Sequence, residues 1–374
     1  MRRLAPAAAS FAALFAAIAG GGCDVRHRRP TPLLGFSAPF VFGRFEVPAD
    51  NPLTDESVEL GRRLFYDRRL SGNDTVSCST CHLQRLAFTD GRRTGIGVSG
   101  KPLAFNSMSL ANLMWGAQHF FWNGRAATLE AQTLVPIQHP DEMAGDLQRL
   151  VAELSADDSY RALFETAYGE ISAAAISRAL ASFERTLISS NSRYDQFLRG
   201  EITLNAQEEW GRKLFMAHPD AKVSLRGGNC IDCHSQFLTS GFSTRLDGFS
   251  NNGLDDEEHL QPGLQSVTGD PAHRGRFKVP TLRNIALTAP YMHDGRFPTL
   301  EEVLHHYNGA IRKSSTLSPL IAEADNRGAQ SQERISLHLT EAEQAATIAF
   351  LHTLTDNDFV TAERFSDPSL RKRK

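Results

Sequence analysis

The chain has 374 residues, of which 41% are apolar and 22% charged, so it is long enough for two ordinary domains with their own cores. This composition excludes a disordered or fibrous protein. Forty basic and 43 acidic residues give a formal charge of −3, and this mildly acidic balance argues against nucleic acid as a partner.

Residues 1–22 have the order of an export signal, with basic Arg2 and Arg3, an apolar stretch from Leu4 to Ile18, and three glycines. The apolar stretch is short and is interrupted by Pro6, which does not favour a membrane span. A buried N-terminal helix is the alternative. We therefore expect an exported, periplasmic protein.

Cys23 follows the glycines in the manner of a lipoprotein processing site. However, Gly20 stands three places earlier, where such sites usually have an aliphatic residue. A lipid anchor through Cys23 is therefore left open. Residues 23–50, with four prolines and no helical period, are predicted to form a linker.

The rest of the chain repeats itself weakly. Segments 60–65 (LGRRLF) and 210–215 (WGRKLF) each precede a cysteine motif, and each is predicted to be a helix with apolar residues four apart on one face. Their glycines are 150 positions apart. We predict an N-terminal domain over 51–192, a C-terminal domain over 193–357, and a basic tail over 358–374 whose last four residues, 371–374, are solvated.

Helical spacing of apolar residues also occurs outside the repeated segments. It runs from Ile176 to Leu187, just before the predicted domain boundary, and from Ala345 to Leu351 near the end of the chain. Strand patterns are sparse. The predicted fold class is therefore mainly α.

Each predicted domain carries one C-x-x-C-H motif. The motif residues are Cys78, Cys81 and His82 in the first domain and Cys230, Cys233 and His234 in the second. In such a motif the two thiols attach to haem vinyl groups and the histidine becomes the proximal iron ligand. We therefore predict two tandem cytochrome c-like domains, each with one covalent c-type haem.

The cysteine count agrees with this prediction. Four of the five cysteines lie in the two motifs and the fifth is Cys23, so the mature chain has no obvious pair left for a disulfide. The alternative is a zinc site built from the four motif cysteines. That site would leave His82 and His234 without an explanation.

Six further segments carry a recognisable pattern. They are 64–71 (LFYDRRLS), 121–125 (FWNGR), 136–138 (PIQ), 142–143 (EM), 280–284 (PTLRN) and 288–295 (TAPYMHDG). In this order they resemble the bacterial di-haem cytochrome c peroxidase and MauG superfamily, over about Leu60 to Asp356. The resemblance implies a peroxidase in which His82 lies under the peroxide-reducing haem and His234 under the electron-transferring haem.

The resemblance also implies residues on the distal side of the first haem. Glu142 matches the family's distal acid, Gln132 its distal glutamine, and Pro136 a proline that restricts the same pocket. A carboxylate over the iron can take a proton from bound peroxide and return it to the departing oxygen. Without the resemblance, Asp141, Glu142 and Asp146 would be interpreted as a solvated acidic loop.

Two more sites are implied between the domains. Trp122 matches a tryptophan between the haems, which suggests an electron relay, although a lone tryptophan is otherwise most often a core residue. Asn106, with the backbone carbonyls of Thr288 and Pro290, resembles a calcium site, whose oxygen ligands suit that cation. Hydrogen peroxide and a small redox protein or oxidisable protein are the implied partners, and a homodimer is left open.

The sixth ligand of the second haem depends on a short helix predicted over 300–307. Segment 299–302 (TLEE) is a capping box and 308–309 (NG) is a stop signal. Peroxidases with a high-potential second haem have a methionine where this chain has Tyr307, and the MauG-like branch has tyrosine. The resemblance therefore implies Tyr307 as a ligand, with Met292 as its rival. Further alternatives are a half-buried phenol that binds nothing and two nearby histidines, His305 and His306.

Two departures from the peroxidase pattern affect the function. Loop 87–106 has no histidine, although many family members place one there to block the first haem, so the peroxide site is expected to be open. Asn123 replaces the usual aspartate, which leaves a propionate or arginine contact in doubt. Three hypotheses follow: a peroxidase supplied through the second haem, a MauG-like enzyme that oxidises residues of a partner protein, and a non-catalytic electron carrier.

Overall fold

The computed structural model describes residues 31, 33, 42, 47–115, 119–235, 248–324, 326 and 335–373. The predicted export signal, Cys23 and most of the predicted linker lie outside this part of the chain. Within it, no helix combines the length and the apolar character that a bilayer span requires.

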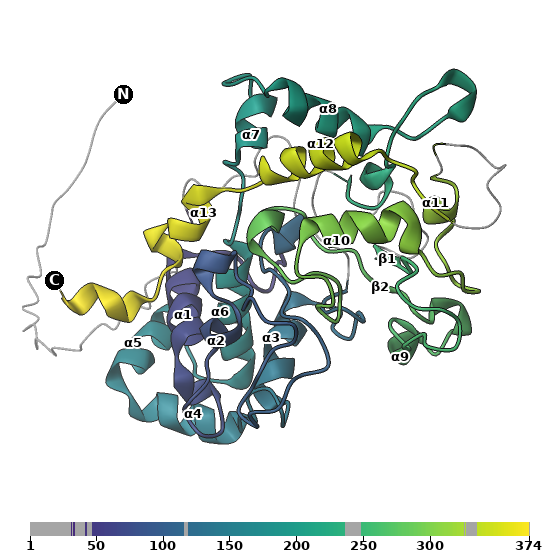
Figure 1. The fold of residues 1–374 in the computed structure, drawn as a ribbon. Coiled ribbons are helices and arrows are strands. Elements are labelled where there is room, and N and C mark those ends of the chain that lie inside the picture. The colour runs from purple at the N-terminus through teal and green to yellow at the C-terminus, as the bar shows by residue number, and fades with distance from the viewer. Residues whose placement is uncertain are drawn as a thin grey trace, which may run out of the picture.

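The fold is mainly helical, as the sequence predicted (Figure 1). The α-helices are α1 (Asp55–Tyr66), α2 (Cys78–Cys81), α3 (Leu129–Gln138), α4 (Leu147–Ala156), α5 (Asp158–Ala167), α6 (Ala173–Arg185), α7 (Arg193–Leu198), α8 (Ala206–Met216), α9 (Gln265–Thr268), α10 (Leu300–His305), α11 (Pro319–Ala322), α12 (Glu341–His352) and α13 (Asn357–Thr361). Strands β1 (Phe249–Ser250) and β2 (Phe277–Lys278) form one antiparallel pair. Short helical turns cover Arg68–Leu70, Gln84–Leu86, Leu113–Trp115, Ala221–Val223, Cys230–Asp232, Pro271–His273, Ile285–Leu287, His306–Ala310, Glu363–Phe365 and Pro368–Arg373.

We refer to the predicted domains over 51–192 and 193–357 as the first and the second unit. In the first unit, α1 crosses α6 at very short range. A side chain at Gly61 would place its Cβ only 1.8 Å from the Ala179 carbonyl oxygen, so the two backbones are in direct contact there. Leu60, Leu64 and Phe183 are fully buried around this crossing. The α1–α6 pair therefore forms the centre of the first core, with the predicted apolar spacing facing inward.

The second unit repeats this crossing with α8 and α12. A Cβ at Gly211 would lie 1.9 Å from the Ala346 carbonyl oxygen, and Phe350 occupies the place of Phe183. The repeat predicted from the two glycines is therefore confirmed. One detail was wrong: Trp210 does not face the core with Leu214 but is 42% exposed.

The C-terminal segment is not a free tail, so the prediction for 358–374 needs correction. Phe359 and Phe365 are each 1% exposed and belong to the core of the first unit, where both rings contact Phe88. Figure 1 shows α13 running from the end of α12 back to the lower unit that contains α1. Apolar side chains in a mostly polar segment carried no helical period, and their burial depends on this return of the chain.

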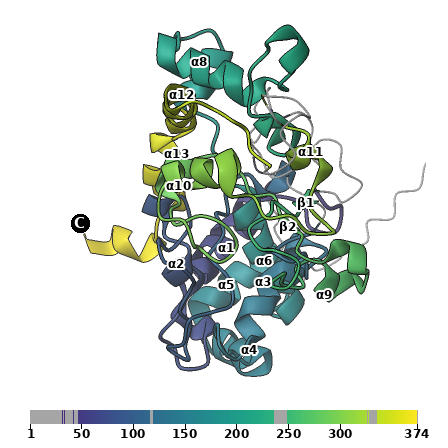
Figure 2. The ribbon, with the colours of Figure 1, turned by 45° about the vertical axis from the view of Figure 1, so that its right-hand side comes forward.

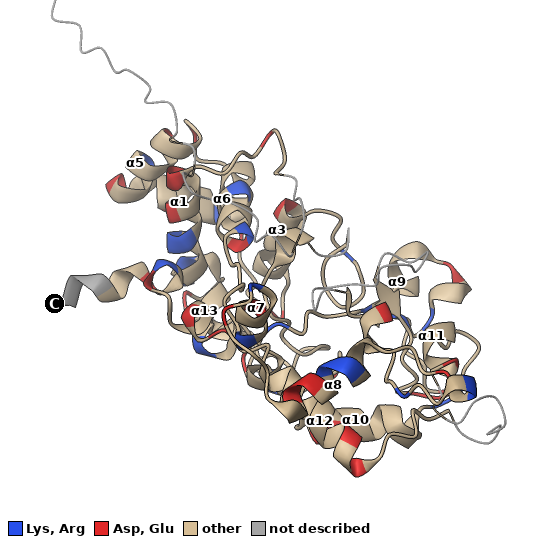
Figure 3. Ribbon diagram, turned by 90° about the horizontal axis from the view of Figure 1, so that it is seen from above, with Lys and Arg blue, Asp and Glu red and all other residues tan. Residues whose placement is uncertain are grey.

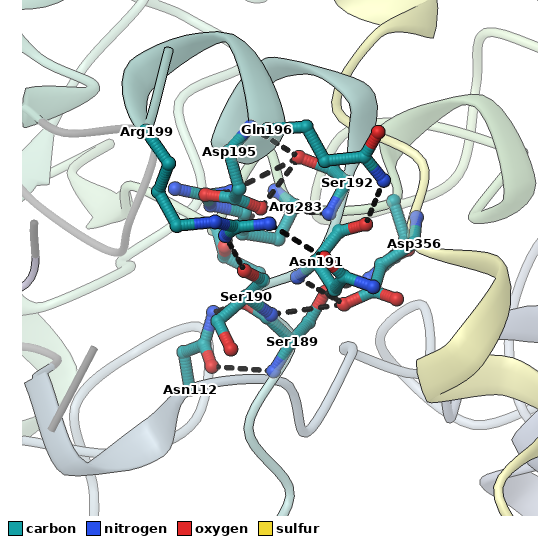
Figure 4. A network of polar contacts seen from close by, with 12 residues as sticks. Asn112, Ser189, Ser190, Asn191, Ser192, Asp195, Gln196, Arg199, Arg283 and Asp356 are labelled. Atoms are coloured by element: carbon teal, nitrogen blue, oxygen red, sulfur yellow. Dashed lines mark hydrogen bonds and ion pairs between the residues drawn. The ribbon is translucent and has the colours of Figure 1, made fainter. Parts of the chain in front are cut away.

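A buried polar network joins the two units. The Asp356 carboxylate accepts hydrogen bonds from the Ser189 hydroxyl and from the backbone amides of Ser190 and Asn191. Nearby, the side chains of Arg283 and Asp195 form an ion pair at 2.6 Å in which each is only 1% exposed (Figure 4). The core changes from the first to the second unit within this stretch, between Leu187 and Tyr194.

The rotated view places α10, β1 and β2 between the α8–α12 pair and the helices of the first unit (Figure 2). Charged residues of both signs are interspersed along the described helices of both units (Figure 3). The predicted helix over 300–307 is present as α10, capped by the Thr299 hydroxyl, and it continues as a π-helical turn over His306–Ala310. Tyr307 lies on this turn.

Candidate haem-binding cavity

One cavity of about 680 Å³ is lined by all the residues that the resemblance and the two motifs implied as catalytic, haem-binding or calcium-binding, apart from the alternative ligands His305 and His306. Its lining includes Cys78, Cys81, His82, Asn106, Trp122, Gln132, Pro136, Glu142, Cys230, Cys233, His234, Thr288, Pro290, Met292 and Tyr307. Both units contribute to it. The two motifs therefore open into one shared space.

The first motif forms the short helix α2, and His82 follows as its C-terminal cap. The His82 ring nitrogen Nδ1 lies 2.8 Å from the Phe88 carbonyl oxygen, which leaves Nε2 as the nitrogen available to a metal. Ala87 and Phe88 both have left-handed backbone angles, and this strained turn presents the carbonyl. Burial lowers the pKa of His82, which favours the neutral imidazole that binds metals.

The second motif is held in the same way from a more distant segment. The His234 Nδ1 lies 3.2 Å from the carbonyl oxygen of Pro280, and burial lowers the pKa of His234 to about 4. Cys230 begins the Cys230–Asp232 turn and Cys233 is its C-terminal cap. The ring of each motif histidine is therefore fixed by a backbone carbonyl on Nδ1.

These observations test whether the residues fit covalent haem. Each motif offers two free thiols and a histidine whose Nδ1 lies against a backbone carbonyl, and both motifs open into the same large cavity. Among the described residues, no three His, Cys, Asp or Glu side chains gather as a metal site, so the zinc alternative for the four cysteines is wrong. The donor set fits haem.

Glu142 lies at the edge of the first haem site, where two cationic or polar side chains approach it. Its Oε1 is 3.3 Å from Arg125 Nη2 and 4.0 Å from His139 Nδ1. The Val98 amide donates to the Glu142 carbonyl, and a Cβ at Gly97 would lie only 2.2 Å from that same oxygen. The glycine allows the 97–98 backbone to support the acidic loop. Glu142 is therefore fixed by contacts of both its side chain and its backbone, and it is not a loosely solvated residue.

Gln132 and Pro136 lie one turn apart on α3 and both face the cavity. The Gln132 Oε1 is buried and has no hydrogen-bond partner among the described residues. Pro136 has no amide hydrogen, so the Gln132 carbonyl also loses its helical partner. The cavity wall therefore contains amide groups that are ready to bind a polar ligand.

Trp122 is 7% exposed and is tied to both units. Its indole Nε1–H donates to the Asn106 carbonyl at 2.8 Å, and its own carbonyl accepts from the Lys278 amide at 2.8 Å. The Asn106 amide in turn donates to the His293 carbonyl. The indole is therefore fixed where the units meet.

The residues of the predicted calcium site, Asn106, Thr288 and Pro290, all line the cavity. The Asn106 Nδ2 donates to the Arg92 carbonyl at 2.9 Å, so the amide oxygen points to the opposite side. The calcium assignment stays a prediction.

Both candidate ligands of the second haem converge on one amide that the sequence did not single out. The Asn252 Nδ2 lies 3.2 Å from Tyr307 Oη and 3.4 Å from Met292 Sδ. Burial raises the pKa of Tyr307 to about 12. His305 is exposed, the His306 ring contacts the Asn252 carbonyl, and neither lines the cavity, which favours Tyr307 and Met292 over both histidines.

The two departures from the peroxidase pattern have structural counterparts. Asn123 donates to the Ser266 hydroxyl at 3.2 Å, while Arg125 pairs with Glu142, so the arginine has a carboxylate partner without the usual aspartate. Arg125 also lies 3.7 Å from the centre of the Phe121 ring. Sequence reasoning missed this role of Arg125, as well as Asn252 and the buried Lys278, because none of them shows a local pattern that predicts burial or contact.

The fold and the cavity define a protein of two helical units with two covalent haem sites that open into one space. The family model of the di-haem cytochrome c peroxidases matches residues 55–203. The methylamine utilization protein MauG of Methylorubrum extorquens is 36% identical over 311 residues, which cover 82% of this chain and 80% of that protein. The cytochrome c peroxidase Ccp of Escherichia coli is 36% identical over 259 residues, 68% of this chain and 53% of that protein.

A solved structure agrees with these relatives. The crystal structure of a MauG-like protein associated with microbial copper homeostasis superposes with a TM-score of 0.77 at 37% identity, covering 89% of this chain and 99% of the other. The chain therefore belongs to the di-haem cytochrome c peroxidase and MauG family. It is a di-haem peroxidase-like oxidoreductase, and the family implies two c-type haems.

Proposed function

We propose that the chain reduces hydrogen peroxide at the haem of Cys78, Cys81 and His82, with electrons passed through the haem of the second motif. The observation that carries this proposal is the placement of Glu142 and Gln132 on the wall of the His82 cavity. When bound, the haem supplies an iron that peroxide can coordinate and that exchanges electrons.

Glu142 performs the proton transfer in this proposal. Its carboxylate accepts a proton from one peroxide oxygen and returns it to the other as the O–O bond breaks. Two electrons and two protons then convert one peroxide into two waters. Arg125, at 3.3 Å, keeps the carboxylate in place, and the Gln132 amide holds the peroxide by hydrogen bonds.

Trp122 connects the two haem sites in the same proposal. It is fixed by hydrogen bonds to Asn106 and Lys278, which belong to different units. Its position supports an electron relay between the sites. Calcium at Asn106 and the carbonyls of Thr288 and Pro290 would stabilise this contact between the units.

Tyr307 is proposed as the sixth ligand of the second haem iron, and Met292 as the rival. A phenolate is a hard anionic donor that favours ferric iron, whereas a thioether raises the potential. The Tyr307 hydroxyl and the Met292 sulfur both lie within 3.4 Å of the Asn252 amide nitrogen, which supports either side chain as the ligand. With Tyr307 as the ligand, the second haem would be a poor acceptor from ordinary cytochromes.

A second candidate is oxidation of residues on a partner protein. It is favoured by two relatives that are named methylamine utilization protein MauG, at 36% and 33% identity, together with Tyr307. Fast oxidation of a reduced small cytochrome would count against it. The non-catalytic carrier, by contrast, does not agree with the membership of a peroxidase-like family. Export to the periplasm is part of either proposal, and a lipid anchor at Cys23 and a homodimer are left open.

The test of the proposal is Glu142→Gln, measured as hydrogen peroxide consumption with the haem content checked to be two per chain. We expect a loss of about 10²–10⁴-fold, which is the contribution of a positioned acid–base group. The matched control is Asp141→Asn, which removes the exposed neighbouring carboxylate and should leave turnover unchanged. Equal turnover in Glu142→Gln and the wild type would refute the assignment.

A further inference from the structure

Lys278 is a buried cation that the proposed reaction does not use. Its side chain lines the cavity, the residue is 4% exposed, and Nζ has no hydrogen-bond partner among the described residues. Burial lowers the pKa of Lys278 to about 7. Burying a charged lysine in this way costs desolvation free energy unless an anion pairs with the ammonium.

The backbone fixes where this side chain stands. Lys278 lies on β2, its amide donates to the Trp122 carbonyl, and Pro280, two residues later, supplies the carbonyl that contacts His234. The neighbouring Phe277 ring stacks on His293 at 3.6 Å between centres. Phe277 and Lys278 both line the cavity. The Lys278 backbone therefore links the Trp122 carbonyl of the first unit to the segment that holds His234 in the second.

The protein itself does not supply the missing anion within the described residues. Glu142 and Glu184 are the two carboxylates that line the cavity there. Glu142 pairs with Arg125, and the buried Oε2 of Glu184 has no hydrogen-bond partner in the same part of the chain. Among the described residues, Lys278 therefore has no carboxylate partner in the cavity. An anionic group of the molecule that fills the cavity would supply one.

We propose that Lys278 Nζ is the subsite for a haem propionate, forming an ion pair with that carboxylate beside Trp122. A propionate is an anionic group that extends from the edge of a haem, and the ion pair would satisfy the lysine. The proposal rests on the two haems that the family implies. It does not depend on the peroxide reaction.

The electrostatic consequence can be measured without turnover. A fixed positive charge near a haem disfavours the ferric state, so removing it lowers the midpoint potential of that haem. We expect Lys278→Met to shift the reduction equilibrium of one haem by tenfold or more, which is about 59 mV for a one-electron couple. Lys278→Arg, which keeps the charge, should stay closer to the wild type.

The experiment is a spectroelectrochemical titration of the holoprotein, with haem counted by pyridine haemochrome in every variant. The control Lys213→Met removes the same charge from the exposed face of α8, 68% exposed, and should leave both potentials unchanged. The proposal is overturned by a Lys278→Met protein with two haems and both potentials equal to those of the control.

A second variant covers a failure of the first to load haem. Lys278→Gln keeps most of the side-chain length and a hydrogen-bond donor but not the charge. Loss of haem from the Met and Gln variants with retention in the Arg variant supports the ion pair. Equal loss from all three contradicts it, because charge would then not be what the site requires. Unchanged peroxide consumption in Glu142→Gln would refute the proposed reaction alone, because the test of Lys278 measures haem potentials and haem content and not turnover.

Discussion

The ion pair between Asp195 and Arg283, both in the second unit, offers a quantitative test of how a buried charge pair stabilises that unit beside the domain boundary. Both side chains are 1% exposed, and their 2.6 Å contact is accompanied by hydrogen bonds from the Ser192 amide and hydroxyl to the same carboxylate. Asp195→Asn keeps the shape but leaves the guanidinium buried without its counter-charge. Breaking a buried pair from one side costs about 3–5 kcal/mol.

The assay is the free energy of unfolding of the holoprotein in urea, followed by circular dichroism and by haem absorbance together. The control is Glu201→Gln, which removes the exposed partner of Arg199 in a 2.7 Å pair and should cost less than about 1 kcal/mol. A double variant, Asp195→Leu with Arg283→Met, should recover much of the loss because no charge is left buried. Equal stability of Asp195→Asn and Glu201→Gln would refute this account of the buried ion pair.

Two further predictions concern the repeated helix crossing and a buried acid. Gly61→Ala and Gly211→Ala should each destabilise the protein by at least about 1–3 kcal/mol in urea unfolding, because the new Cβ would overlap a carbonyl oxygen. Gly200→Ala, where the added Cβ meets no atom within 4 Å and the cost is that of a left-handed φ of +74°, should lose less, and equal losses at all three would count against the crossing. Burial raises the pKa of Glu184 to about 8, so between about pH 4.5 and 8 the native carboxyl keeps a proton that the unfolded chain has lost, and stability falls as pH rises through that window. Glu184→Gln should remove this slope of up to about 1.4 kcal/mol per pH unit, and a constant difference from the wild type at every pH would contradict it.

The parts of the site that depend on local sequence could be predicted. The two cysteine motifs specify their own short turns, and the apolar spacing around the two repeated glycines specifies α1 and α8. The family resemblance added Glu142, Gln132 and Trp122. The structure brings all of these residues to one cavity.

The remainder depends on contacts between distant segments. The two-residue strand that holds Lys278 has no sequence period, and its burial comes from pairing with Phe249 and bonding to Trp122. Asn252 meets Met292 and Tyr307 across at least 40 residues of chain. No spacing rule predicts such contacts, just as none predicted the exposure of Trp210.

The most direct test of the central claim, two unequal haems in one cavity, is low-temperature electron paramagnetic resonance of the diferric protein before and after one equivalent of hydrogen peroxide. We predict a high-spin signal from the site of His82 and Glu142 and a low-spin signal from the site of His234 and Tyr307, both lost on adding peroxide. Tyr307→Phe should alter the low-spin signal, and Met292→Leu should not. A protein with two haems, no high-spin signal and no response to peroxide would contradict the account.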